Sequence, residues 1–120
     1  MTWISRFRID LPDVPLDPQS AQTLALLLHE LLTNAVKYGA LSVPNGMVFL
    51  SGTADGVAEP RVRFEWRETG CPPTSAPAKT GFGMTMLNLS IRQKGGTVEF
   101  DWGSQGLICR FDMRTRRVIG

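Results

Sequence analysis

Hydrophobic and polar positions follow two different periods along the chain, and each change of period marks an expected element. Apolar residues alternate with polar ones over 4–10, 47–52, 60–68, 97–102 and 106–113, which predicts five strands. They recur with a helical period over about 18–38 and about 83–94, which predicts two helices. The order β-α-β-β-α-β-β favours an antiparallel or mixed sheet with both helices on one face, a two-layer α+β sandwich.

Turn-forming residues separate these elements at the expected places. Three prolines within 12–18 block regular structure after the first strand. Asp17 is the expected N-cap of the long helix, with Pro18 at its first position and Gly39 as a left-handed C-cap. A polar turn over 53–59 and a short one over 103–105 predict two hairpins.

The long helix has an apolar stripe with a polar flank beside it. At about 100° per residue, Glu30, Asn34 and Lys37 fall within an arc of roughly 60° at the margin of the stripe, the rim between helix and sheet. Glu30 and Lys37 alone also fit a solvated pair. Asn34 favours a cleft wall, because asparagine is a poor helix-interior residue unless its side chain is used. The stripe expected to pack on the sheet consists of Leu24, Leu27, Leu28, Leu31, Ala35 and Tyr38.

The only histidine, His29, points away from this flank. It falls on the helix wheel next to Ala25, Leu32 and Val36, so we expect a packed histidine. No second histidine or cysteine lies at metal-ligand spacing from it, which argues against a zinc site.

A second polar region surrounds the loop before the second helix. A strand delivers Glu68 to its end, Gly70 turns the chain, and Gly81, Phe82 and Gly83 open the helix. Glycines before a helix let backbone N–H groups approach an anion, which predicts a polyphosphate site. Glycine also starts helices for steric reasons alone. The pattern matches neither a P-loop nor a dinucleotide-binding fingerprint.

Composition narrows the class of protein. A length of 120 residues fits one domain, 1–120. The net charge of +2, without a sustained basic run, does not indicate nucleic-acid binding. Cys71 and Cys109 are too few for a disulfide framework, so a reduced, cytoplasmic setting is expected. No apolar run reaches the roughly 18 residues of a membrane span, so no direct membrane contact is expected.

The two polar regions together resemble the ATP-binding domains of the GHKL superfamily, which have the Bergerat fold. The segment "HELLTNAVKY" over 29–38 is similar to the N box of that superfamily, and "GFGM" over 81–84 is similar to its later glycine box. More narrowly, the chain resembles the HWE histidine kinases. That subfamily is defined by a histidine in the N box, here His29, and by a W-x-E motif, here Trp66 and Glu68.

The resemblance implies a role for each polar residue. Asn34 would bind the Mg2+ ion that bridges the phosphates of ATP, and Glu30 would order the water shell of that metal. Lys37 and Tyr38 would face the phosphates. Glu68 would accept a hydrogen bond from the amino group of adenine. The glycine-rich segments would supply close backbone contacts to the nucleotide through Gly70, Gly81, Phe82 and Gly83.

The function implied is that of the ATP-binding catalytic lobe of a bacterial two-component sensor histidine kinase. Glu30, Asn34 and Lys37 would be its catalytic residues, and Mg2+-ATP its ligand. The phosphoryl acceptor would be a histidine on a separate dimerisation domain, whose helices this chain lacks. A response regulator would be an indirect partner. Two alternatives stay open: a serine kinase of the anti-sigma-factor type, and a degenerate lobe of a histidine phosphotransferase, which the intact motif set disfavours.

Overall fold

Six strands and two α-helices make up the part of the chain that the structure describes. The computed structural model describes residues 2–4, 6–13, 16–56, 60–71, 82–93 and 95–115. In chain order the elements are β1 (Thr2–Ile4), β2 (Phe7–Asp10), α1 (Pro18–Tyr38), the 3-10 turn η1 (Ala40–Ser42), β3 (Met47–Asp55), β4 (Arg61–Thr69), α2 (Phe82–Gln93), β5 (Thr97–Trp102) and β6 (Leu107–Arg114).

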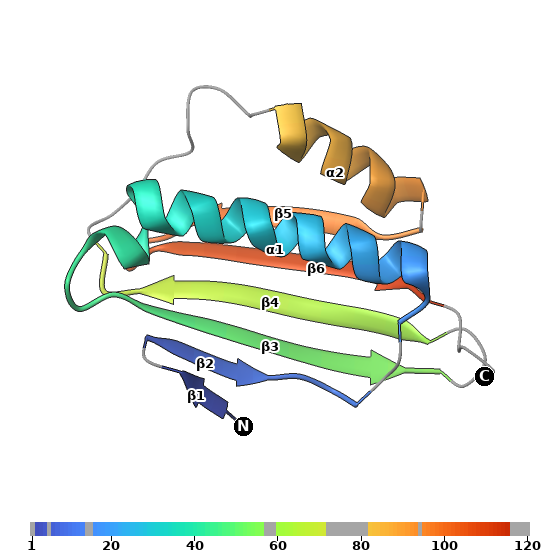
Figure 1. Cartoon of the computed structure of the whole chain (residues 1–120), viewed down its shortest axis with the longest axis horizontal. Coiled ribbons are helices and arrows are strands. Elements are labelled where there is room, and N and C mark those ends of the chain that lie inside the picture. The colour runs from blue at the N-terminus through green and yellow to red at the C-terminus, as the bar shows by residue number, and fades with distance from the viewer. Residues whose placement is uncertain are drawn as a thin grey trace.

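The strands form one mixed sheet in the order β1-β2-β3-β4-β6-β5. Only β2 and β3 run parallel, with Phe7 opposite Val48, because α1 connects them as a crossover. The remaining pairs are antiparallel. Both helices lie on the same side of the sheet (Figure 1). The predicted two-layer α+β sandwich is therefore confirmed.

Two predicted strands differ from the structure by more than one residue. The expected single strand over 4–10 is a hairpin of β1 and β2, because Arg6 binds its side chain into the loop after α1 and interrupts the strand. The strand expected to end at 52 continues to Asp55. Its added residues complete the ladder with β4, and the Asp55 carboxylate lies 2.6 Å from the Arg63 guanidinium.

Helix α1 begins and ends at the predicted residues, although its C-cap differs from the prediction. The Asp17 carboxylate accepts a hydrogen bond from the Ser20 backbone N–H at 2.7 Å, which caps the first turn. Gly39 has φ −112° and ψ −147°, so it is not left-handed. Glycine is needed there for space, because a Cβ atom would lie 2.1 Å from Oε1 of Glu68.

The buried face of α1 follows a row of every fourth residue. Thr23, Leu27, Leu31 and Ala35 are buried, and the next position in this row is Gly39. The row drifts around the helix by about 40° per step, so Tyr38 leaves the packed face and is 73% exposed. Its predicted place in the apolar stripe was wrong. Leu24 and Leu28 are half-buried at the edge of the core.

The core lies between the helices and one face of the sheet. Phe64 and Phe111 stack there with ring centroids 5.0 Å apart. Alternation along the strands sends the polar residues to the opposite, open face. The buried apolar side chains are Leu27, Leu31, Ala35, Ala40, Val48, Leu50, Val62, Phe64, Trp66, Ile91, Leu107, Cys109, Phe111 and Met113.

The packed position expected for His29 was also wrong. His29 is exposed, and its apolar neighbours on the outer face of α1 are exposed too, Leu32 by 40% and Val36 by 55%. A two-layer architecture covers only the inner face of each helix, which explains the difference. Within the described residues, no helix combines the length and apolar character that crossing a bilayer requires.

Candidate functional site

The carboxylate of Glu68 is buried near the end of β4, and two protein groups hold it in place. Glu68 is only 3% exposed. Oε1 accepts a hydrogen bond from the Ala40 backbone N–H at 2.8 Å, and Oε2 accepts one from the Trp66 indole N–H at 2.9 Å. Trp66 and Glu68 share a face because side chains alternate along a strand. The W-x-E spacing therefore aligns donor and acceptor.

Glycines allow the backbone to close around Glu68. A Cβ atom on Gly39 would lie 2.1 Å from Oε1 of Glu68, and one on Gly106 would lie 2.6 Å from the backbone oxygen of Glu68. Gly70 has φ +81°, and a Cβ atom there would lie 2.7 Å from the backbone oxygen of Asn45. The end of β4 is therefore tightly packed against the loop after α1 and the turn between β5 and β6.

The polar flank of α1 leads to the same end of the molecule. The last turn of α1 and the end of β4 lie together at the left of Figure 1. Ala35, next to Asn34 in the chain, contributes a Cα atom 3.1 Å from the Cβ position of Gly39, where Glu68 also packs. Glu30 and Asn34 are half-buried and Lys37 is exposed. Among the described residues, none forms a side-chain hydrogen bond or ion pair with these three.

The predicted glycine box lies only partly within the described residues. Phe82 and Gly83 begin α2, one residue earlier than predicted. Gly81 lies outside the described residues, as does most of the loop that follows Gly70. The roles predicted for these residues stay predictions.

Neither cysteine near the sheet provides a reactive thiolate. Burial raises the pKa of the Cys71 thiol, the charge of Glu68 raises it further, and the charge of Arg6 lowers it. Burial raises the pKa of Cys109 to about 12. Both thiols are therefore protonated near neutral pH, and protonated thiols are poor nucleophiles.

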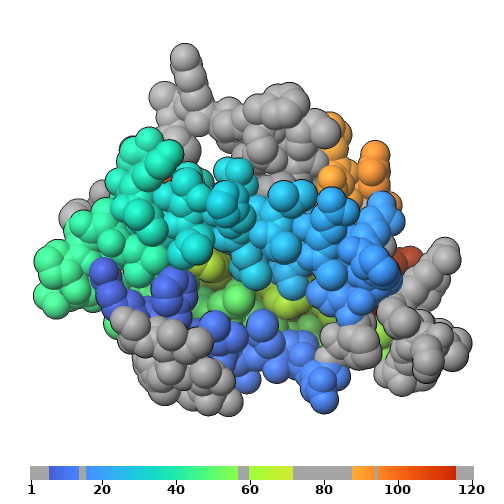
Figure 2. Space-filling model, in the orientation of Figure 1, coloured from blue at the N-terminus to red at the C-terminus, as the bar shows by residue number. Residues whose placement is uncertain are grey.

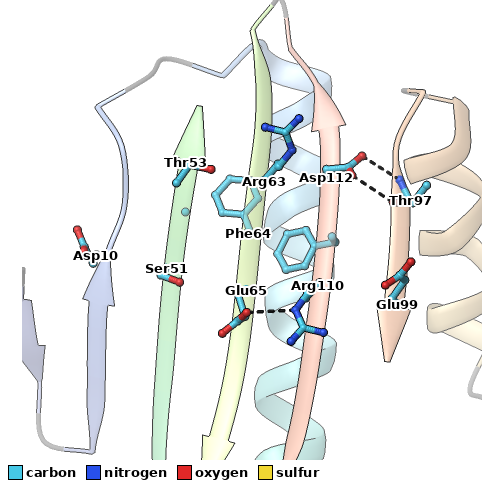
Figure 3. Close-up of a pocket in the computed structure, with 12 residues that line it drawn as sticks. Asp10, Ser51, Thr53, Arg63, Phe64, Glu65, Thr97, Glu99, Arg110 and Asp112 are labelled. Atoms are coloured by element: carbon cyan, nitrogen blue, oxygen red, sulfur yellow. Dashed lines mark hydrogen bonds and ion pairs between the residues drawn. The ribbon is translucent and has the colours of Figure 1, made fainter. Parts of the chain in front are cut away.

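A separate hollow of about 480 Å³ lies on the open face of the sheet (Figure 3). Its charged groups pair across strands: Arg110 Nε donates to Glu65 at 3.2 Å, and Asp112 accepts from the Thr97 backbone N–H at 3.2 Å. None of the predicted site residues lines it. The lining residues are Asp10, Ser51, Gly52, Thr53, Arg63, Phe64, Glu65, Thr97, Glu99, Arg110, Phe111 and Asp112.

Comparison with known proteins gives close relatives of the chain, although no family model matches it. Blue-light-activated histidine kinase 1 of Erythrobacter litoralis is 40% identical over 100 residues, which are 80% of this chain. The blue-light-activated histidine kinase of Rhizobium johnstonii is 33% identical over 103 residues, 81% of this chain. The chain belongs to the HWE family of histidine kinases. The resemblance seen in its motifs is thereby confirmed.

Solved structures show that the chain has the fold of histidine kinase catalytic domains. The histidine kinase domain of the Erythrobacter litoralis blue-light-activated kinase matches 92% of it and 55% of that domain, with a TM-score of 0.65 and 21% identity. The catalytic domain of the histidine kinase ThkA matches 93% of it and 80% of that domain, with a TM-score of 0.61 and 18% identity. The chain spans only 27% and 28% of the two curated relatives.

Three features of this candidate site were missed in the sequence. The W-x-E spacing does predict a shared face for Trp66 and Glu68, yet their hydrogen bond was not foreseen. The partner of the other carboxylate oxygen, Ala40, is 28 residues away, and no local pattern indicates it. Arg6, which binds the loop carrying Ala40, was taken only as a charged residue of the first strand.

Proposed function

We propose that this histidine kinase chain binds Mg2+-ATP between the polar flank of α1 and the end of β4. The observation that carries the proposal is the Glu68 carboxylate, buried and held by two donors beside the last turn of the helix that bears Glu30, Asn34 and Lys37. Burying a carboxylate is costly unless it serves a hydrogen-bonding purpose. We assign that purpose to recognition of the nucleotide, as the resemblance to the ATP-binding domains of histidine kinases implies.

The fixed carboxylate of Glu68 suits the recognition of adenine. An ionised carboxylate offers about four acceptor positions, and Ala40 and Trp66 occupy two of them. A further position can accept the amino group of the base. Gly70, with its positive φ, lets the chain turn away directly after β4 so that a flat base has room nearby.

The flank of α1 fits Mg2+ and phosphates by the chemistry of its donors. Asn34 offers an amide oxygen and Glu30 a carboxylate, the hard oxygen ligands that Mg2+ prefers. Among the described residues, no cluster of three or more acidic, histidine or cysteine side chains forms a metal cage. A Mg2+ ion held by Asn34, water and substrate phosphates needs no such cage. When bound, the ion offsets the charge on the phosphoryl group in transfer.

The remaining residues place the triphosphate. Lys37 is exposed on the same flank, where its ammonium group can approach the phosphates, and the exposed Tyr38 follows it as the last residue of α1. Gly81, Phe82 and Gly83 lead into the N-terminus of α2, and unpaired backbone N–H groups at such an end favour anions. These side and main chains orient the nucleotide for in-line transfer.

The acceptor in this proposal is a histidine of a dimerisation domain outside the chain, and a response regulator receives the phosphoryl group afterwards. His29 belongs to the exposed outer face of α1, away from the flank with Glu30 and Asn34, so it is not placed to accept. The relatives favour a histidine kinase over a serine kinase of the anti-sigma-factor type. The free thiols of Cys71 and Cys109 fit a reducing, cytoplasmic compartment.

Calorimetric titration with a non-hydrolysable ATP analogue tests the proposal. We expect binding in the micromolar to millimolar range that requires Mg2+. Asn34→Ala should weaken this binding at least about tenfold, because it removes the protein's direct ligand to the metal. Asn88→Ala, on the half-exposed face of α2, is the matched control and should bind as the original chain does. Equal affinity in both variants would contradict the metal role of Asn34.

A further inference from the structure

On the basis of the function proposed above, we propose that Arg6 is a positioning residue that helps the site to select the base of the nucleotide. Its guanidinium fixes the segment 40–46, named here the 40–46 loop. The loop in turn presents the Ala40 N–H that fixes Glu68 for the amino group of adenine. Arg6 lies before β2, far in sequence from both the loop and Glu68, and it belongs to none of the sequence motifs described above.

The guanidinium of Arg6 donates hydrogen bonds to several backbone carbonyl groups of the 40–46 loop. Arg6 Nε donates to the backbone oxygen of Gly46 at 2.8 Å, and Nη2 donates to that of Ala40 at 2.6 Å. Nη2 also donates to the oxygen of Val43, and Nη1 reaches that of Leu41 at 3.5 Å. Arginine presents five N–H donors in a planar fork, so a single side chain can serve several acceptors at once.

The 40–46 loop needs such a donor because it contains the short turn η1. The last carbonyl groups of a helical turn have no partner within the turn, and Arg6 supplies partners for Ala40 and Leu41. The backbone oxygen of Arg6 in turn accepts from the Val48 N–H at 3.0 Å. Arg6 is therefore anchored to the sheet while its side chain holds the loop. Figure 2 shows the start of the blue segment lying against the green one.

Close packing transmits the position of the loop to Glu68. Ala40 is held on both sides, with its oxygen on Arg6 and its N–H on Glu68 at 2.8 Å. A Cβ atom on Gly46 would lie 1.8 Å from the Ala40 oxygen, so the loop leaves no space inside itself. A displaced loop would therefore move the Ala40 N–H away from Glu68, and the carboxylate would lose one of the two donors that orient it.

The charge of Arg6 also acts at this end of the sheet. It lowers the pKa of Cys71, against the effects of burial and of Glu68. Arg6 and Glu68 are thus both within electrostatic reach of Cys71. A role in base selection differs from a role in folding alone, because the former changes the preference between bases and the latter changes all binding equally.

The affinities for ATP and inosine triphosphate, measured with Mg2+ by calorimetry, separate these roles. Inosine triphosphate carries an oxygen in place of the amino group, so position 6 of its base presents an acceptor to Glu68 and cannot donate. We expect the original chain to prefer ATP about 10- to 100-fold, the range of a hydrogen bond to a charged group. Arg6→Gln should lower this preference at least about threefold. Arg63→Gln, which removes an exposed guanidinium bonded to Asp55, should leave it unchanged.

Arg6→Lys covers the case in which Arg6→Gln does not fold. An ammonium group cannot reproduce the planar fork, so we expect a preference between those of Arg6→Gln and the original chain. An original preference in a folded Arg6→Gln or Arg6→Lys variant, even with weaker binding of both nucleotides, would overturn the role of Arg6 alone. Failure of the original chain to bind ATP, or to prefer it, would instead refute the proposed function.

Discussion

Glu68 is a structural residue of the fold and also the residue proposed to recognise the base. Its carboxylate satisfies the Ala40 N–H and the Trp66 indole N–H, two donors at the end of β4. Because the residue is 3% exposed, water cannot readily replace these bonds if the carboxylate is removed. The residue proposed to select the base is therefore coupled to the stability of the fold.

We expect Glu68→Ala to lower the free energy of unfolding by about 2–5 kcal/mol, because it leaves two buried donors without partners. Chemical denaturation followed by tryptophan fluorescence measures the loss. Glu99→Ala, on the exposed face of β5, is the matched control, and its effect should stay within about 0.5 kcal/mol. A Glu68→Ala variant as stable as this control would show that the two hydrogen bonds contribute little.

At the scale of elements, the sequence pattern predicted those helix and strand ends that neighbouring residues determine. The ends of α1 follow from Asp17, Pro18 and Gly39, and the β5 range was predicted to the residue because its polar and apolar positions alternate cleanly. The division of the first strand was not predictable. It depends on Arg6 binding a loop 34 residues or more further along the chain, and no local period records such a contact.

The same distinction explains the site. The spacing of Glu30, Asn34 and Lys37 fixes one helix flank, so their common location could be predicted. The conformation of Gly39 could not be predicted, because the Glu68 side chain, and not the helix itself, limits the space at that position. The exposure of Tyr38 depends likewise on the path of the buried row across the sheet.

Asp17, the N-cap of α1, should contribute more to the free energy of unfolding than Asp55, which forms a surface ion pair. Asp17 caps Ser20, and its backbone N–H donates to Thr115 Oγ1 at 2.9 Å, so Asp17 joins the helix to the end of β6. We expect Asp17→Ala to cost about 1–2 kcal/mol of unfolding free energy. Asp55→Ala, which breaks only the exposed pair with Arg63, should cost between about 0 and 1 kcal/mol. Equal losses in thermal denaturation would refute the capping argument.

At the scale of the whole molecule, a buried thiol in the core should make the fold less stable at alkaline pH. Cys109 is fully buried on β6, and burial raises the pKa of its thiol from the ordinary 9.0 to about 12 in the folded state. A thiol whose pKa is raised by folding stabilises the folded state. Its full contribution is present at pH values below the pKa of the thiol in the unfolded chain. This contribution is lost as the pH rises from the unfolded value toward the folded one.

We therefore expect the unfolding free energy to fall by about 2 kcal/mol between pH 8 and pH 10.5 through Cys109 alone. Urea titrations at the two pH values measure this loss. Cys109→Ala should be less stable at both values because of the cavity it creates, yet its stability should fall less with pH. Cys71→Ala, at a half-buried position, should keep most of the loss. An unchanged pH dependence in Cys109→Ala would exclude the buried thiol as its cause.

Among the described residues, two places could bind a ligand: the end formed by α1 and β4, and the charged hollow on the open side of the sheet. An NMR titration with a Mg2+-bound ATP analogue distinguishes them most directly. We predict that the signals of the Trp66 indole N–H and the Ala40 amide shift, while those of the Thr97 and Asp112 amides stay in place. Shifts confined to Thr97 and Asp112, or none at saturating nucleotide, would contradict the proposed site.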